Sequence, residues 1–168
     1  YTKLCELALK RENTDFLDKS IEDARNVKLK LEVDKCIIGY KSRLFRCERI
    51  RNSYVGEYAM LTSSTLDDTC LLSSSSSPTS ILSHSSLSAC IVHPGCSTGP
   101  GISLSSSLLL EHSAVGERGR VSHCVLAPDA HIAGGECAHS LVGPFVGMHH
   151  TSLLISSIWC LGRGNIGY

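Results

Sequence analysis

The sequence predicts a mainly β protein: a parallel β-helix over residues 36–168, which follows a helical segment and a lead-in strand over residues 1–35. Three observations support this prediction. From Cys36 onward aliphatic residues recur about every six positions, small residues stand between them, and aromatic residues make up only 5% of the 168 residues. Such a period fits neither an α-helix nor a two-sided strand, but it fits a three-sided coil with one short strand on each side.

The core of this coil is predicted to be a stack of aliphatic side chains. The recurring positions are Leu44, Ile50, Val55, Leu61, Leu66 and Leu72, followed after a break by Ile81, Leu87, Ile91, Ile102, Leu108, Val115, Val121, Leu126 and Ile132. We expect each to point into a narrow prism, with a small residue after it at the corner, as in Val55-Gly56 and Val115-Gly116. About 18 residues would complete one turn, and successive turns would stack at about 4.8 Å.

Residues 1–26 have a helical pattern. The apolar residues Leu4, Leu7 and Ala8 share one face of a first helix, and those of a second helix are Phe16, Leu17, Ile21 and Ala24. Residues 13–15 (Asn, Thr, Asp) are suited to begin the second helix because their side chains cap free backbone N–H groups. From residue 27 the apolar period changes to two, which predicts a strand leading into the β-helix.

Charge and hydropathy argue against two classes of protein. Residues 1–53 hold 13 Lys and Arg and 9 Asp and Glu, whereas residues 54–168 hold 3 and 7. The basic part is therefore mixed in sign, while nucleic-acid binding needs an unbalanced basic face. The sequence has no apolar run of about 18 residues, so no membrane span is expected. It also shows no signal peptide, and we expect a cytoplasmic protein.

The nine cysteines allow two interpretations. Their spacing is irregular and lacks a C-x-x-C motif, although a disulfide framework remains an alternative. Five of them, Cys36, Cys70, Cys90, Cys124 and Cys137, stand among small or apolar residues. This setting favours buried free thiols in a reducing cytosol.

A serine run over residues 73–77, followed by Pro78, interrupts the repeat. It is either a linker between two domains or a loop that projects from one corner of the coil. The repeat resumes at Ile81, which favours a loop near residues 73–80. The chain begins with Tyr1 and stops at residues 165–168 within a further repeat, so we expect a fragment of a longer chain.

Three segments resemble a known family: residues 47–59 (CERIRNSYVGEYA), 141–155 (LVGPFVGMHHTSLLI) and 161–168 (LGRGNIGY). They are similar to a family of long, functionally uncharacterised hexapeptide-repeat proteins. That family lies within the superfamily of trimeric acyltransferases and of the β-helical tails of sugar-phosphate nucleotidyltransferases. The resemblance covers residues 36–168 and implies a left-handed β-helix, a homo-oligomer, most simply a trimer, and acyl-CoA as a possible donor bound between neighbouring prisms.

The candidate catalytic residues are His149 and His150. They follow Gly147 near a predicted tight turn, and the hydroxyls of Thr151 and Ser152 come next. In the acyltransferases that the chain resembles, a histidine takes a proton from the acceptor, a task that a pKa near neutrality suits. The alternative is that one histidine caps a corner and the other is a surface residue.

A second group of candidates would bind a substrate phosphate. Arg163 and Asn165 lie in the glycine-spaced sequence 162–165 (GRGN). Such a loop brings backbone N–H groups and a guanidinium to a phosphate, and Thr151 and Ser152 could contribute hydroxyls. The alternative is that the glycines serve only a backbone with positive φ.

Zinc is a less favoured alternative. His123, His131 and His139 stand close to Cys124 and Cys137, and imidazoles and thiolates bind zinc. The γ-class carbonic anhydrases share the β-helical fold and bind zinc between subunits, but the H-x-x-x-x-H pair typical of them is absent.

The function predicted from the sequence is a transferase that acts on a nucleotide-linked or phosphorylated sugar, by acyl or nucleotidyl transfer. It would need no cofactor and would bind a small-molecule substrate. The first alternative is a non-catalytic β-helical scaffold for oligomerisation or ligand binding. The second is a zinc enzyme similar to γ-carbonic anhydrase. The sequence leaves the substrate and the donor open.

Overall fold

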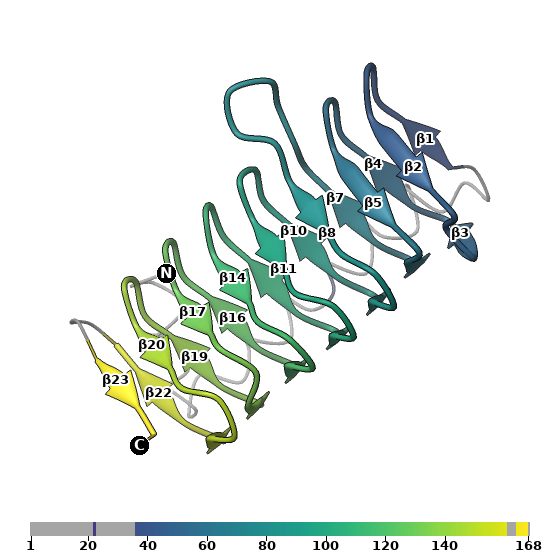
Figure 1. The fold of residues 1–168 in the computed structure, drawn as a ribbon. Helices are drawn as coiled ribbons and strands as arrows, with labels where there is room; N and C mark the ends of the chain where they lie inside the picture. The colour runs from purple at the N-terminus through teal and green to yellow at the C-terminus, as the bar shows by residue number, and fades with distance from the viewer. Residues whose placement is uncertain (1–21, 23–35, 161–163, 168) are drawn as a thin grey trace.

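The computed structural model describes residues 22, 36–160 and 164–167, and within these ranges the chain forms a parallel β-helix (Figure 1). The predicted β-helical fold is therefore confirmed. The two helices and the lead-in strand expected over residues 1–35 lie outside the described residues, except for Glu22, which is helical and exposed.

The strands form three parallel sheets, here named A, B and C. Sheet A contains β1 (Ile37–Ile38), β4 (Tyr54–Val55), β7 (Cys70–Leu71), β10 (Ile91–Val92), β13 (Leu108–Leu109), β16 (Val125–Leu126), β19 (Leu141–Val142) and β22 (Ile158–Trp159). Sheet B contains β2 (Arg43–Phe45), β5 (Met60–Thr62), β8 (Ser80–Ile81), β11 (Ser97–Thr98), β14 (Ala114–Val115), β17 (His131–Ile132), β20 (Gly147–Met148) and β23 (Asn165–Ile166). Sheet C contains β3 (Arg49–Arg51), β6 (Thr65–Asp67), β9 (Ser86–Ser88), β12 (Ser103–Ser105), β15 (Arg120–Ser122), β18 (Glu136–Ala138) and β21 (Leu153–Ile155).

A regular coil of the β-helix contains fewer residues than the approximately 18 that the sequence predicted. Ser107 and Cys124 occupy equivalent places on successive coils and are 17 positions apart, and Ser53 and Thr69 are 16 positions apart in the same way. The shortening falls mainly between sheets C and A. There the buried residue Leu104 of β12 and the next inward residue, in β13, are five positions apart, not six.

Most strands bury one side chain in the prism. The buried residues include Val55, Leu61, Val115 and Val121, as the sequence predicted. In sheet A the prediction was wrong by one position three times. Leu71, Val92 and Leu109 are buried, whereas Leu72, Ile91 and Leu108 are not. Strands β10 and β13 carry an aliphatic residue on both faces, and Leu72 directly follows Leu71, so the pattern alone did not distinguish inward from outward.

At each of the three corners the backbone turns through a residue with positive φ. The A–B corners use Lys41, Tyr58, Gly95, His112, Asp129 and Phe145; the B–C corners use Arg46, Ser63, His84, Gly101, Arg118, Gly134, Thr151 and Gly167; and the C–A corners use Asn52, Asp68, Ala89, Ser106, His123, His139 and Ser156. The corner residue itself is therefore not always small, in contrast to the prediction. Small residues are instead required near the corner residue, where the backbones of two coils come close together. For example, a Cβ added to Gly56 would lie 2.5 Å from the backbone nitrogen of Ser73 in the next coil, which is too close.

A column of hydroxyl and thiol side chains stabilises the C–A corners. Each side chain donates a hydrogen bond to the carbonyl oxygen two residues earlier. Its members are Ser53, Thr69, Cys90, Ser107, Cys124, Ser140 and Ser157, and we call it the C–A spine. In three places the hydroxyl oxygen also accepts the backbone N–H of the next member, at 3.1 Å, which links successive coils. Cysteine here substitutes chemically for serine.

We expect Cys124→Ser to change the free energy of unfolding by less than about 1 kcal/mol, because a hydroxyl can make the same bond to the carbonyl of Ser122. Cys124→Val is expected to cost about 1–3 kcal/mol, because a branched side chain overfills this buried corner. Urea denaturation of both variants measures the difference. Equal stability of the two variants would contradict this role of the spine.

Residues 72–79 form a wide loop between β7 and β8, at an A–B corner (Figure 1). The hydroxyl of Thr79 donates to the carbonyl of Leu72 at 2.7 Å and closes the base of the loop. The three sheets continue on both sides of the loop, so it interrupts no sheet. No helix in the described ranges combines the length and the hydropathy that a bilayer crossing requires.

Candidate functional site

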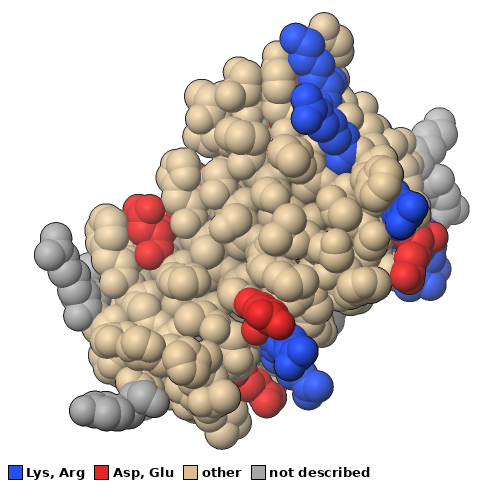
Figure 2. All heavy atoms as spheres, in the orientation of Figure 1, with Lys and Arg blue, Asp and Glu red and all other residues tan. Residues whose placement is uncertain are grey.

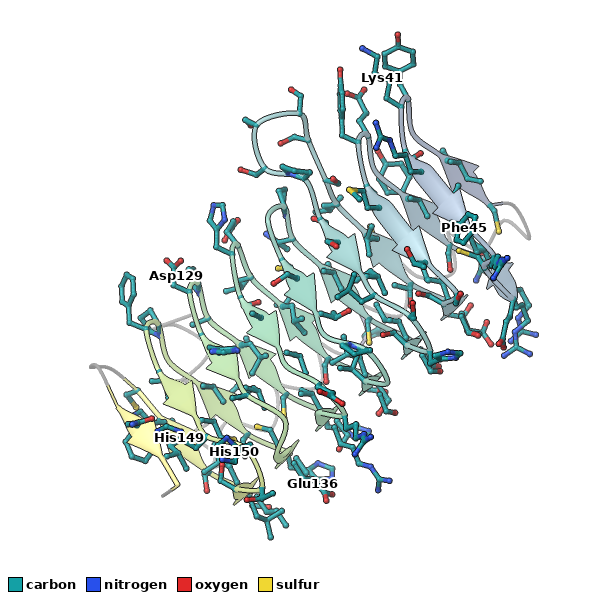
Figure 3. All side chains as sticks on the ribbon, viewed as in Figure 1. Lys41, Phe45, Asp129, Glu136, His149 and His150 are labelled. Carbon is teal, nitrogen blue, oxygen red and sulfur yellow. The ribbon has the colours of Figure 1, made fainter. Side chains whose placement is uncertain are left out.

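The predicted histidine pair lies at the B–C corner that follows β20. His150 and Thr151 are exposed and His149 is half-buried, and the φ of Thr151 is 63°. The two imidazole rings meet edge to face, with centroids 6.1 Å apart. Figure 3 shows both side chains close together at the end of the β-helix opposite to Lys41.

The structure brings Asn165 to this pair from the next coil. Its Nδ2 atom lies 2.7 Å from Nε2 of His149. The Ser152 hydroxyl donates to the carbonyl oxygen of His149, and the backbone N–H of His149 donates to the carbonyl of Ile166 at 2.8 Å. Three predicted site residues, His150, Ser152 and Asn165, thus contact His149. The Thr151 hydroxyl donates instead to the carbonyl of His150, and Arg163 lies outside the described residues.

The contact between His149 and Asn165 decides which ring nitrogen is free. When the amide donates to Nε2, the proton of a neutral ring is on Nδ1 and neither nitrogen is an open base. When the amide is flipped end for end, its oxygen accepts from Nε2–H and Nδ1 becomes the free base. Asn165 would then orient the ring, as the acidic residue does in a catalytic triad. The corner is chemically competent for proton transfer only in this second arrangement.

A cavity of about 590 Å³ lies at the opposite end of the β-helix. It is lined by Lys41, Ser42, Arg43, Tyr58, Met60, Ser75 and Pro78. These residues come from the A–B corners of the first two coils, from strands β2 and β5, and from the loop 72–79. We call it the serine-loop cavity.

Two of the residues that line the serine-loop cavity, Lys41 and Arg43, are cationic. The Lys41 Nζ atom lies 5.2 Å from the ring centroid of Tyr40 and 5.5 Å from that of Tyr58, which is cation–π geometry. The rings of Tyr40 and Tyr58 pack edge to face at 6.4 Å. Within the described ranges no carboxylate forms a salt bridge with Lys41 or Arg43. Figure 2 shows a group of Lys and Arg side chains at this end of the molecule.

The sequence prediction missed this cavity. It used the basic residues only to argue against nucleic-acid binding, and it interpreted the serine run as a loop or, alternatively, a linker. The signal that was available is the coil register, in which Arg43 pairs with Met60 and Met60 pairs with Ser80. This register places the serine loop at the same corner as Lys41 and Tyr58.

The zinc candidates are not brought into one site. His123 and His139 stack at adjacent C–A corners, with ring centroids 4.7 Å apart, but His131 lies on sheet B. Both stacked histidines have positive φ, a conformation in which histidine is enriched, so their backbone explains their presence. No cluster of three or more His, Cys, Asp or Glu side chains suited to a metal ion occurs in the described ranges.

The two cysteines near these histidines form a buried thiol pair. The Sγ atoms of Cys124 and Cys137 are 3.5 Å apart, and both residues are buried. The hydrogen bond with Cys124 and burial together raise the pKa of the Cys137 thiol. A protonated buried thiol is a poor metal ligand and a poor nucleophile.

Two carboxylates on the outer surface are held in their charged form. A bidentate hydrogen bond from Arg51, at 2.8 and 2.9 Å, lowers the pKa of Asp67. A hydrogen bond from His93, at 2.8 Å, lowers the pKa of Glu111. Each pair joins two neighbouring coils. Neither carboxylate belongs to the serine-loop cavity or to the His149 corner, so we assign them a structural role.

Comparison with known proteins gives a family but no activity. Among curated proteins, none was found to match the chain. One protein family matches residues 5–167, which include every described strand and both candidate sites. Since the match spans nearly the whole chain, this β-helical protein belongs to the family described as "Domain of unknown function (DUF4954)".

Proposed function

We propose that this β-helix is a ligand-binding scaffold that holds a phosphorylated or nucleotide-linked sugar in the serine-loop cavity. The observation that carries the proposal is the presence of both Lys41 and Arg43 in the lining of a cavity of about 590 Å³. This volume is within the range of small-molecule sites. A guanidinium binds phosphate through two parallel hydrogen bonds, and an ammonium adds a compact positive charge.

The rest of the lining supports a sugar or a base beside the phosphate. Tyr58 and Met60 provide an aromatic ring and a thioether, against which a ring can pack. Ser42 and Ser75 provide hydroxyls for the polar edge of a ligand. None of the lining residues is a His, Cys, Asp or Glu, the side chains that most often act as general acids, general bases or nucleophiles. This composition favours binding over catalysis.

Calorimetric titration with glucose 1-phosphate and with UDP-glucose tests the binding. We expect Lys41→Ala/Arg43→Ala to weaken the binding of either ligand at least about tenfold, because two charged hydrogen-bond donors are lost. Affinity should also fall as salt rises. Arg118→Ala is the control, since Arg118 is an exposed corner residue outside the cavity. The proposal fails if neither ligand binds, or if the double variant binds as tightly as the control.

A second candidate function is acyl transfer from acyl-CoA at the His149 corner. It is supported by the 2.7 Å contact between Asn165 Nδ2 and His149 Nε2. With the amide flipped, its oxygen would accept from Nε2–H, and Nδ1 would take the proton of an acceptor hydroxyl or amine. His150, Thr151 and Ser152 would contact the substrate, and Arg163 would bind its phosphate. A neighbouring prism of a homotrimer would complete the acyl-CoA groove, as the resemblance to trimeric acyltransferases implies.

Turnover of acetyl-CoA with an amino-sugar phosphate tests this second candidate. We expect His149→Ala/His150→Ala to lower kcat at least about a hundredfold while circular dichroism and Tm stay unchanged. Asn165→Ala should reduce kcat less, because it removes only the group that orients the ring. His84→Ala, at another B–C corner, is the control. Absence of acetyl transfer by the unaltered protein, or full activity of the double variant, would exclude the candidate.

A further inference from the structure

The first coil of the β-helix carries an exposed row of aromatic and basic side chains along β2. Tyr40 and Lys41 stand at the A–B corner before this strand, whereas Phe45 and Arg46 stand at its other end, at the B–C corner. Figure 3 shows Lys41 and Phe45 at the two ends of β2. Tyr40 is 67% exposed and Phe45 is 58% exposed. Arg43 lies between the two pairs and is also exposed, and we call these five residues the first-coil patch.

The following coils do not repeat this combination of residues. The next coil has Thr62 at the place of Phe45 and Ser63 at the place of Arg46. Among the described strands of sheet B, none after β2 has Lys or Arg at the place of Arg43. Those places hold Met60, Ser80, Ser97, Ala114, His131, Gly147 and Asn165. Most of these side chains are short, so the longer ones of the first-coil patch project from one end of the face.

The charge of the first-coil patch is not compensated by nearby acids. Residues 36–62 hold five Lys and Arg and two Glu, whereas residues 63–160 hold two Arg and six Asp and Glu. Within the described ranges the three cations of the patch form no salt bridge with a carboxylate. The other two basic residues of the first coil, Arg49 and Arg51, lie against Asp67 instead. An uncompensated positive surface is complementary to an anionic partner.

The contacts between rings and cations favour a membrane surface over a nucleic acid as that partner. Single-stranded nucleic acids bind by stacking bases on aromatic faces. In the patch Arg46 lies over the Phe45 ring, with its Cζ atom 5.0 Å from the centroid, and the Lys41 Nζ atom lies 5.2 Å from the centroid of Tyr40. A cation therefore already covers one face of each ring. At a membrane surface, aromatic rings enter the headgroup layer while basic side chains keep their charged ends at the phosphates, and no open ring face is needed.

We propose that the first-coil patch binds the surface of membranes that contain anionic phospholipids. Its two exposed rings enter the headgroup layer, and its three cations contact the lipid phosphates. Each cation close to such a surface strengthens binding about fivefold. This inference does not rest on either proposed function, because Phe45 and Arg46 neither line the serine-loop cavity nor belong to the His149 corner.

Co-sedimentation of the full chain with lipid vesicles tests this binding. We expect the protein to bind vesicles of mixed phosphatidylglycerol and phosphatidylcholine but not vesicles of phosphatidylcholine alone. Raising the salt from about 0.1 M to about 1 M should release it, because the screening length shortens. Phe45→Thr/Arg46→Asn should weaken binding at least about tenfold, because a ring and a cation are lost. Threonine stands at this place in the next coil, and asparagine tolerates the positive φ of Arg46.

The matched control is Arg118→Asn/Phe145→Asn, which also removes one arginine and one exposed ring. Arg118 stands at a B–C corner, as Arg46 does, and Phe145 is 62% exposed at an A–B corner. This variant should bind the vesicles as the unaltered protein does. The proposal is overturned if the unaltered protein binds neither kind of vesicle or both equally, or if the two pairs of substitutions weaken binding to the same degree. It is also overturned if the protein binds oligodeoxythymidylate in place of vesicles, because the patch then serves a nucleic acid.

Discussion

Leu104→Ala is expected to lower the free energy of unfolding by about 2–5 kcal/mol. Leu104 is 1% exposed in β12 and stacks between Leu87 and Val121 of the neighbouring coils. The prism is too narrow for distant side chains to move into the space, so the cavity left behind adds to the lost burial of the methyl groups. Urea denaturation followed by circular dichroism measures the change.

The control for Leu104 is its neighbour Ser103, whose exposed side chain points away from the prism. Ser103→Ala should change stability by less than about 0.5 kcal/mol. Because each coil contacts only its neighbours, hydrogen exchange should locate the weakening in the coils next to β12. If Leu104→Ala were no more destabilising than Ser103→Ala, Leu104 would not belong to a packed core.

Gly99→Ala is expected to cost about 3 kcal/mol, far more than an ordinary glycine substitution. An added Cβ would lie 2.5 Å from the backbone nitrogen of Glu117 in the next coil. Backbone cannot rotate away as a side chain can, so two coils must separate locally. The φ of Gly99 is outside the left-handed region, and the cost therefore comes from space alone. Thermal and urea denaturation measure it.

Gly147→Ala, in β20 of sheet B, provides a comparison for Gly99, which directly follows β11 of that sheet. Its added Cβ would come no closer than 3.4 Å, to the side-chain oxygen of Asn165. We expect a change of less than about 1 kcal/mol, since that side chain can rotate. Similar losses for the two alanine variants would mean that the close approach of coils at Gly99 does not limit stability.

The sequence was sufficient to predict the β-helix because an aliphatic period near six has few other structural solutions. It failed where a strand has two aliphatic residues in a row, as at Ile91-Val92 and Leu108-Leu109. A better signal was present: the small residue of the C–A spine stands two positions before the inward residue. Cys90 precedes Val92 in this way, and Ser107 precedes Leu109.

The two candidate sites were not equally accessible from the sequence. His149 and Asn165 are 16 residues apart, so knowledge of the coil length brings them together. The coil register places the serine loop at the corner of Lys41 and Tyr58, but the serine-loop cavity also depends on the path of the loop 72–79, which a periodic pattern does not specify. Periodicity in the sequence predicts the register of the coils but not the conformation of a loop that does not follow the repeat.

The fixed path of each coil constrains how this protein can change in length during evolution. A single residue inserted within a strand would exchange inward and outward side chains for the remainder of that strand. Whole coils can be duplicated or deleted without this conflict, because strand pairing resumes in phase. Other insertions are tolerated at corners, as the loop 72–79 illustrates. New binding specificity is therefore expected to arise from corner loops, while the prism changes in length by complete coils.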